Sequence, residues 1–218
     1  MTAKRGELLI ATGSRHKFAE LQELLDLPQT YLLSLTDVGL SDSAKEEGES
    51  FAANAVAKAL HYARLSGMPT LADDSGLEVD ALGGRPGVRT RRYAGLDATD
   101  DQNNQLLLAE LGALRMRPDA RTARYQCVLV LAEPAGDDES AGDEEPVVTE
   151  TTRGTFEGRI ALEPRGDEGF GYDPIFEPDS EPVGGRTVGE LNTAEKNEIS
   201  HRAKAARAMR EKLIARGY

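Results

Sequence analysis

The strongest constraint on the fold is a change in how apolar residues are spaced along the chain. In the first part of the sequence, short apolar runs typical of strands alternate with segments whose leucines and alanines have helical spacing. Two long strand-like segments, over 121–133 and 147–157, follow later and indicate a hairpin. Alternating strands and helices favour parallel pairing, whereas a hairpin is antiparallel. We therefore expect an α/β fold with a mixed β-sheet flanked by helices.

Caps and helix breakers set the expected bounds of these elements. Ser50 is suited to cap a helix that ends before Gly67, and Pro28 should stop an earlier helix. A turn at Ser75 and Gly76 is expected to separate two short strands, and Ser200 to cap the last helix. The expected strands cover 7–12, 31–35, 70–73, 77–82, 121–133 and 147–157, and the expected helices cover 15–26, 50–66, 99–111 and the segment from about 201.

Size and charge narrow the classes of function. With 218 residues, of which 39% are hydrophobic, the chain has enough apolar surface for a core, and we expect one domain over 1–218. A net charge of −12 argues against sequence-independent binding of nucleic acid, which needs a basic surface. Six acidic residues lie within 135–146, and they predict a solvated acidic loop.

The cysteine content and the length of the apolar runs indicate the cellular compartment in which the protein is expected. The single cysteine, Cys127, lies in a strand-like apolar run and has no partner for an internal disulfide, so a reducing compartment is the simpler expectation. The first apolar run is too short for a secretory signal, and none approaches the roughly 18 residues of a membrane span. These observations predict a cytoplasmic protein with no membrane partner.

A short motif after the first expected strand is suited to binding an anion. In ATGSRHK (11–17), a strand, a glycine turn and a helix start place backbone N–H groups where they attract phosphate. Ser14 caps the helix in this arrangement, and Lys17 falls in its first turn. The spacing is not that of a Walker A loop. An ordinary capped turn between a strand and a helix has the same pattern.

Two further segments contribute acidic, amide and basic side chains that could bind a metal ion or phosphate. In LADDSG (71–76), Asp73 and Asp74 should point in different directions, because side chains alternate along a strand. One carboxylate can then face Mg²⁺, which prefers carboxylate ligands and retained waters. Asn54 and Lys58, four residues apart, share one face of the expected helix. An acidic surface turn and a solvated polar stripe also explain these residues.

An aromatic segment rich in glycine precedes a basic segment near the C-terminus. In GFGYDPIF (169–176), the glycines let the backbone approach a flat ligand, so that Phe170 or Tyr172 can stack on a base. A single helix through the later KNEISHR segment would point its basic side chains three ways, and a break before His201 resolves this. A histidine packed at a helix start is the local alternative.

Taken in order, these motifs resemble the inosine triphosphate pyrophosphatase family, which acts on deaminated purine nucleotides. The resemblance runs from residue 8 to about residue 213, nearly the whole chain. The motifs that carry it are ATG (11–13) with Lys17, EEGESFAANAVAK (46–58), ADDSG (72–76), GGRPG (83–87), RYAG (92–95), GFGYDPIF (169–176) and KNEISHR (196–202).

The resemblance implies an elongated mixed sheet in two lobes with the active-site cleft between them, a Mg²⁺ cofactor and a homodimer. It also implies that Asp74 ligates or orients the metal and acts as the base toward the attacking water, with Glu46 as a further ligand. The residues it implies for substrate binding are Thr12, Gly13, Ser14, Arg15, His16, Lys17, Asn54, Lys58, Ser75, Phe170, Gly171, Tyr172, Asp173, Lys196, His201 and Arg202.

The implied reaction is hydrolysis of ITP, dITP and XTP to the monophosphate and pyrophosphate, which removes deaminated purines from the nucleotide pool. Two positions depart from the family pattern. Ser14 stands where the family usually has Asn, and it still caps a helix. Lys45 stands where many members have a metal-binding Glu, which makes Glu46 the substitute. The alternatives are a pyrophosphatase for modified pyrimidine nucleotides and a nucleotide sensor without catalysis.

Overall fold

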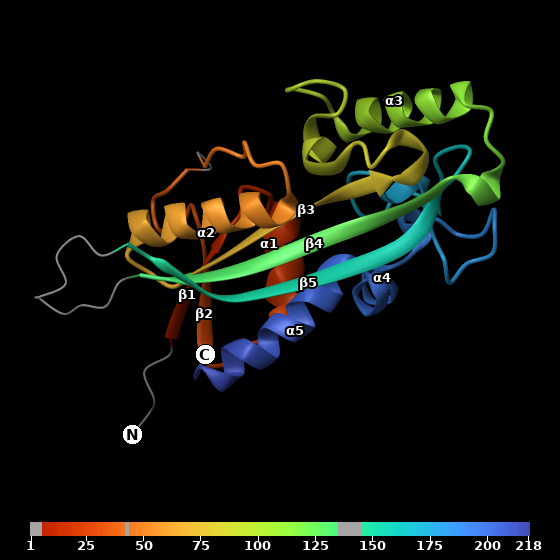
Figure 1. Ribbon diagram of the computed structural model, residues 1–218. Coiled ribbons are helices and arrows are strands. Elements are labelled where there is room, and N and C mark those ends of the chain that lie inside the picture. The colour runs from red at the N-terminus through yellow and green to blue at the C-terminus, as the bar shows by residue number, and fades with distance from the viewer. Residues whose placement is uncertain (1–5, 42–43, 135–144) are drawn as a thin grey trace, which may run out of the picture. The chain divides into compact units, whose positions relative to one another are not determined.

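The computed structural model describes residues 6–41, 44–134 and 145–218. Its six strands form one sheet in the order β2-β1-β3-β4-β5-β6 (Figure 1). The strands are β1 (Gly6–Ala11), β2 (Thr30–Ser34), β3 (Thr70–Val79), β4 (Thr122–Glu133), β5 (Val147–Ile160) and β6 (Phe176–Pro178). The helices are α1 (Arg15–Leu25), α2 (Phe51–Ser66), α3 (Asp100–Ala113), α4 (Thr193–Ile199) and α5 (His201–Ala215).

The pairing within the sheet is mixed. β1 pairs in parallel with both β2 and β3, whereas β5 and β6 are antiparallel. The first pairs are joined through helices, as parallel neighbours require. The predicted α/β fold with a mixed sheet is therefore confirmed, and Figure 1 shows α2 and α5 on opposite sides of the strands.

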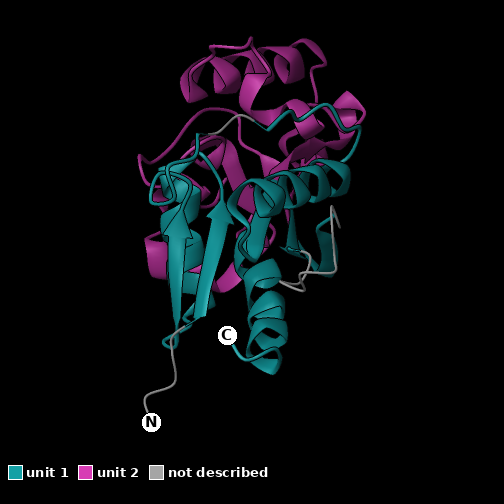
Figure 2. Cartoon of the chain, turned by 90° about the vertical axis from the view of Figure 1, so that its left-hand side faces the viewer, with its two compact units in different colours: residues 1–74, 127–154, 202–218 teal, residues 75–126, 155–201 magenta. Residues whose placement is uncertain are grey.

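The chain divides into two compact units, which are coloured separately in Figure 2. Unit 1 comprises residues 1–74, 127–154 and 202–218, and unit 2 comprises residues 75–126 and 155–201. Strands β3, β4 and β5 each contribute residues to both units. The predicted acidic loop lies outside the described residues except at Glu145 and Pro146. None of the helices in the described ranges has the length and apolarity that crossing a bilayer requires.

Unit 1 has a core of aliphatic side chains from its strands and from two helices. Leu21 and Leu25 of α1 are fully buried together with Leu8 of β1 and Met209 of α5. Helix α1 begins where the Ser14 side chain accepts a bond from the backbone N–H of Lys17, as predicted. This packing fixes the start of α1 relative to the end of β1.

We expect Leu21→Ala to lower the free energy of unfolding by about 2–5 kcal/mol, because it leaves a cavity in a fully buried position. Urea denaturation followed by circular dichroism measures the change. Leu65→Ala on α2 is the control, since Leu65 is 52% exposed and its loss should cost less than about 0.5 kcal/mol. Equal effects of the two substitutions would contradict the assigned core.

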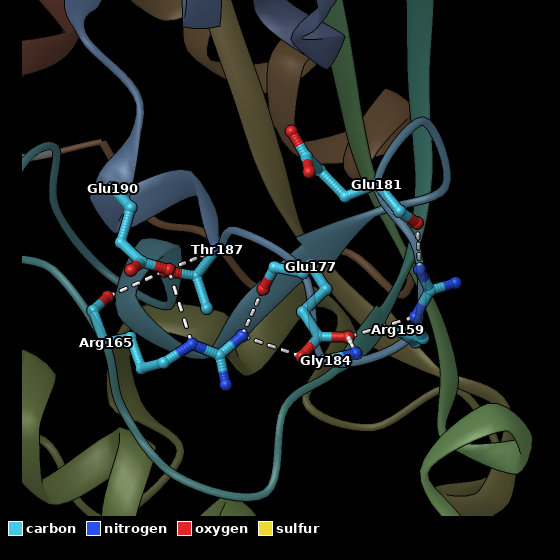
Figure 3. A network of polar contacts seen from close by, with 8 residues as sticks. Arg159, Arg165, Glu177, Glu181, Gly184, Thr187 and Glu190 are labelled. Carbon is cyan, nitrogen blue, oxygen red and sulfur yellow. Dashed lines mark hydrogen bonds and ion pairs between the residues drawn. The ribbon is translucent and has the colours of Figure 1, made fainter.

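Unit 2 has its own core and a network of ion pairs around one buried carboxylate. Glu177 is 3% exposed and accepts bonds from Arg159 Nε at 3.0 Å, Arg165 Nη2 at 2.8 Å and the Gly184 backbone N–H at 3.1 Å (Figure 3). Arg165 Nε also donates to Glu190 at 3.3 Å. A buried charge is tolerated only when it is paired and bonded in this way. The network therefore ties the segment after β6 to β5 and to the loop that follows β5.

One predicted turn is wrong. Ser75 and Gly76 do not separate two strands, because β3 continues through them as a single strand from Thr70 to Val79. Both residues are buried within a strand of the sheet, and this environment outweighs their local preference for turns. The predicted second strand ends at Val79, where a 3₁₀ helix, Asp80–Leu82, follows.

The predicted break near the C-terminus is confirmed. Helix α4 ends at Ile199, and Ser200 has the extended backbone angles φ −66° and ψ 158° before α5 begins at His201. His201 and Arg202 therefore occupy the first turn of α5, and Lys196 belongs to α4, as the pattern of charges indicated.

Candidate active site

The turn between β1 and α1 has the geometry expected of an anion site. The Ser14 backbone N–H donates to Thr12 Oγ1 at 3.2 Å, and the Lys17 backbone N–H donates to Ser14 Oγ at 3.3 Å. Gly13, Arg15 and His16 are exposed at this turn. The start of α1 thus carries the partial positive charge of a helix N-terminus beside a lysine.

Asp73 is the centre of a buried ionic group in unit 1. Its side chain is fully buried and lies 2.9 Å from Lys17 Nζ and 3.8 Å from Arg202 Nη2. Arg202, which is 2% exposed, also pairs with Glu20 of α1. Burial alone would raise the pKa of Asp73, but the Lys17 ammonium and the Arg202 guanidinium hold that pKa well below its usual range. Asp73 therefore links β3, α1 and the first turn of α5.

Asp74 points the other way, as strand alternation predicted. Its Oδ2 accepts a bond from Asn54 Nδ2 at 3.1 Å, and its Oδ1 lies 3.8 Å from Lys58 Nζ. Lys58 Nζ also donates to Glu46 at 2.5 Å. Burial raises the pKa of Asp74 to about 6, although Lys58 and Lys17 act in the opposite direction. Of these two neighbouring carboxylates of β3, Asp73 thus has a lowered pKa and Asp74 a raised one.

Asn54 is held in place by a second bond. Its Oδ1 accepts from the Gly48 backbone N–H at 2.8 Å while its Nδ2 donates to Asp74. A Cβ at Gly48 would lie 2.6 Å from Asn54 Oδ1, so a side chain there would displace the amide. The segment that carries Glu46 is therefore tied to α2, and α2 to β3.

In the described ranges, no group of three or more His, Cys, Asp or Glu side chains is arranged to hold a metal ion. Two carboxylates, Asp74 and Glu46, instead share the Lys58 ammonium. The pKa of Glu46 is lowered despite its burial, because Lys58 lies beside it. Both carboxylates therefore have the same ammonium group as a neighbour.

In unit 2, Asp173 organises the aromatic segment. Its Oδ2 accepts from the Phe170 backbone N–H and from Lys196 Nζ, each at 2.9 Å, and its Oδ1 accepts from the Tyr125 hydroxyl at 3.3 Å. Gly169 has φ +77°, and a Cβ there would lie 2.2 Å from Asp173 Oδ2. Only glycine allows this approach of the backbone to the carboxylate.

The structure distinguishes the two aromatic candidates of that segment. Tyr172 is 3% exposed, packs in the core of unit 2 and donates its hydroxyl to the Thr90 carbonyl at 2.8 Å. Phe170 is partly exposed, and the Lys196 ammonium lies 4.6 Å from its ring centroid. Of these two rings, Phe170 is the more exposed.

His201 also belongs to unit 2, where its ring stacks on Tyr125. The two ring centroids are 4.7 Å apart and the rings are 6° from parallel. His201 is 6% exposed. The aromatic partner fixes the plane of the imidazole at the start of α5.

The residues predicted for the site fall into two groups, one in each unit. The first group, in unit 1, contains Thr12, Gly13, Ser14, Arg15, His16, Lys17, Glu46, Asn54, Lys58, Asp74 and Arg202. The second group, in unit 2, contains Ser75, Phe170, Gly171, Tyr172, Asp173, Lys196 and His201. Arg202, which the resemblance places beside the base with His201, forms ion pairs with Glu20 and Asp73.

Four residues of these groups were missed by sequence reasoning. Glu20 pairs with Arg202, Tyr125 supports both Asp173 and His201, and Asp100 and Asn104 bond the backbone of Gly171. Asp100 and Asn104 lie four residues apart, so the helical spacing was available as a signal. Glu20 and Tyr125 had no local signal, because their partners are distant in sequence.

Known proteins with sequences and structures similar to this chain come from several bacteria. Residues 8–212 match the Ham1 family. A dITP/XTP pyrophosphatase of Shigella flexneri is 44% identical over 207 residues, covering 95% of this chain and 98% of that protein. One from Bacillus subtilis is 41% identical over 210 residues, covering 96% and 98%. The structure of a HAM1 protein from Coxiella burnetii superposes with a TM-score of 0.80 at 41% identity, covering 96% and 99%.

Proposed function

The chain belongs to the Ham1 family, and we propose that it hydrolyses dITP, ITP and XTP to the nucleoside monophosphate and pyrophosphate. The resemblance inferred from its motifs is confirmed by these relatives. The observation that carries the proposal is the arrangement of Asp74, which is bonded by Asn54 and faces Lys58 and Glu46. A buried carboxylate beside basic groups is suited to hydrolysis of a polyphosphate.

The first group of residues is proposed to bind the triphosphate. The N-terminus of α1 offers backbone N–H groups after Thr12, and Lys17 and Lys58 supply ammonium groups. Both lysines are paired with carboxylates in the chain, which keeps their ammonium groups at fixed positions. Fixed cations stabilise the charge of a leaving pyrophosphate without having to reorganise during the reaction.

The same group fits a Mg²⁺ ion, by the chemistry of its donors. Asp74 and Glu46 already hold a cation, Lys58, between them. Two carboxylates leave most of an octahedral shell to waters and phosphate oxygens, as Mg²⁺ prefers. A bound Mg²⁺ would neutralise charge on the phosphate oxygens and orient them.

Removal of divalent metal is expected to abolish pyrophosphate release. The test is dITP hydrolysis in excess EDTA, followed by titration with Mg²⁺, with thermal unfolding as a check that the fold is retained. Activity should return with Mg²⁺, because a divalent cation would offset the repulsion between the two carboxylates and the negatively charged substrate phosphates. Undiminished turnover in EDTA would contradict a metal at Asp74 and Glu46.

In the proposed reaction, a water molecule attacks the α-phosphorus and the bond between the α-phosphorus and its bridging oxygen breaks. Asp74 accepts the proton of the water as the new P–O bond forms, and the Asn54 amide fixes the orientation of its carboxylate. Lys17 and Lys58 are proposed to neutralise the pyrophosphate that leaves. No covalent intermediate with the chain is required.

The second group is proposed to select the purine. Hypoxanthine and xanthine carry a 6-oxo acceptor where adenine has a 6-amino donor. Donors from the turn at His201 would bond the oxo group and would leave an amino group unpaired. A site that is built to donate can discriminate by roughly 10⁴-fold on this basis. Phe170 is proposed to stack on the base, and Asp173 to fix the loop that carries it.

We expect Phe170→Ala to raise KM for dITP by roughly 5- to 100-fold, because stacking of one base on an aromatic ring contributes about 1–3 kcal/mol. Steady-state kinetics with dITP measures the change, and kcat should move much less. Phe170→Tyr is the matched control, since it keeps the ring. A KM unchanged in Phe170→Ala would exclude stacking on this residue.

The proposed function is tested by measuring pyrophosphate release over a panel of triphosphates with Mg²⁺. The proposal is supported if pyrophosphate is released much faster from dITP, ITP and XTP than from ATP and GTP. Preference for modified pyrimidine nucleotides would favour the first alternative, and binding without product would favour a sensor. The homodimer, the cytoplasmic location and the absence of a nucleic-acid partner belong to the same proposal, and light scattering tests the dimer.

A further inference from the structure

Helix α3 holds one residue of the aromatic segment from two sides. Asp100 Oδ2 accepts a bond from the Gly171 backbone N–H at 2.7 Å, and Asn104 Nδ2 donates to the Gly171 carbonyl at 3.0 Å. Asp100 and Asn104 are one helical turn apart and so share a face of α3. Both peptide groups of Gly171, the residue directly after Phe170, are therefore fixed by side chains of α3.

The backbone around Phe170 is restrained by further hydrogen bonds within its own segment. The Phe170 N–H donates to Asp173 Oδ2 at 2.9 Å, and the Phe170 carbonyl accepts from the Asp173 N–H at 3.3 Å. Gly171 has φ +66°, a conformation that side-chain-bearing residues rarely adopt. The direction in which the Phe170 ring projects is thus set by Asp173 on one side and by α3 on the other.

Ordinary helix capping does not explain the two bonds from α3. The start of the helix is already capped by Thr99, whose hydroxyl accepts from the Gln102 N–H while Gln102 bonds the Thr99 N–H in return. Asn104 is 4% exposed, and burying an amide is costly unless it makes hydrogen bonds. Its neighbour Asn103 is equally buried but bonds a different segment, at Arg91 and Ala94.

We propose that Asp100 and Asn104 are positioning residues for purine recognition, acting through Gly171 to hold the Phe170 ring in its stacking orientation. The inference rests on the proposed function, because it takes the purine as the ligand of Phe170. It assigns neither residue a contact with substrate. Loss of either bond lets the ring reorient, which weakens contacts with the base and leaves contacts with the phosphates unchanged.

Two pairs of variants separate positioning from general stability. Asp100→Ala removes both the charge and the acceptor, whereas Asp100→Asn removes the charge but keeps an oxygen that accepts from Gly171. Asn104→Ala removes the donor to Gly171, whereas Asn103→Ala removes an equally buried amide from the same helix and leaves Gly171 bonded. Thermal unfolding of the full chain is recorded for all four.

The readouts are KM and kcat for dITP and the inhibition constants of dIMP, which has a base, and of pyrophosphate, which has none. Asp100→Ala and Asn104→Ala should each raise KM and the dIMP constant by about 3- to 10-fold, the effect of one lost hydrogen bond. The pyrophosphate constant and kcat should change less than about twofold. Asp100→Asn and Asn103→Ala should leave all four values near those of the unmodified chain.

A double-substitution cycle with Phe170 completes the test. If α3 acts through the ring, Asn104→Ala should no longer affect KM in a chain that already carries Phe170→Ala. An unchanged dIMP constant, parallel changes for dIMP and pyrophosphate, or full additivity with Phe170→Ala would each overturn the inference. Failure of the unmodified chain to hydrolyse dITP or to bind dIMP would instead remove the proposed function itself, so the two failures are distinct.

Discussion

Asp74→Asn is expected to lower kcat for dITP by roughly 10²–10⁴-fold, the contribution of a positioned general base. An amide cannot take the proton of the attacking water, and it is a poor ligand for a divalent cation. Its oxygen can still accept from Asn54, which donates to Asp74 at 3.1 Å. Asp74 is 6% exposed, and the substitution keeps its shape, so we expect the melting temperature to change by only a few degrees.

Pyrophosphate release by the purified variant measures this effect, together with circular dichroism to confirm the fold. Asp167→Asn is a suitable control, because Asp167 is an exposed carboxylate in a loop of unit 2. It should retain full activity. A folded Asp74→Asn protein that turns over dITP at the normal rate would show that another group activates the water.

Asp73→Ala, one residue earlier, should act on stability instead. We expect it to lower the free energy of unfolding by about 3–5 kcal/mol, because it removes a carboxylate that pairs with one buried and one partly buried cation. Lys17 lies 2.9 Å from Asp73, and Arg202, which is 2% exposed, lies 3.8 Å away. Arg202 keeps its contact with Glu20, which limits the loss. Urea denaturation at neutral pH provides the measurement.

A matched control for Asp73 is an ion pair at the surface. Asp119 pairs with Arg117, and both side chains are largely exposed, at 48% and 80%. Asp119→Ala should therefore change the free energy of unfolding far less than Asp73→Ala does, because ion pairs between exposed side chains contribute little to stability. If Asp73→Ala were no more harmful than Asp119→Ala, the buried ionic group would not hold β3, α1 and α5 together as described.

Much of the fold was accessible from local signals. Ser14, Ser50 and Thr99 were expected at helix starts, and all three accept the backbone bond of an N-cap. The break at Ser200 followed from the directions of the basic residues, and the structure confirms it. Where sheet pairing and local preference disagree, as at Ser75 and Gly76, the sequence pattern was misleading because burial within the sheet decides the conformation.

The candidate site was predictable only in part, for a physical reason. Strand alternation separated Asp73 from Asp74, but it could not show which one would be enclosed by Lys17 and Arg202. Similarly, the motif offered Phe170 and Tyr172 as equivalent rings, and only packing against the core of unit 2 distinguishes them. Such assignments depend on contacts between residues far apart in sequence, which local spacing does not encode.

The most direct test of the central claim is hydrolysis of dITP in water labelled with ¹⁸O, with both products analysed by mass spectrometry. Attack of an Asp74-activated water on the α-phosphorus predicts equal amounts of dIMP and pyrophosphate, with the label in dIMP alone. Label in pyrophosphate, or release of orthophosphate with dIDP, would contradict the proposed reaction.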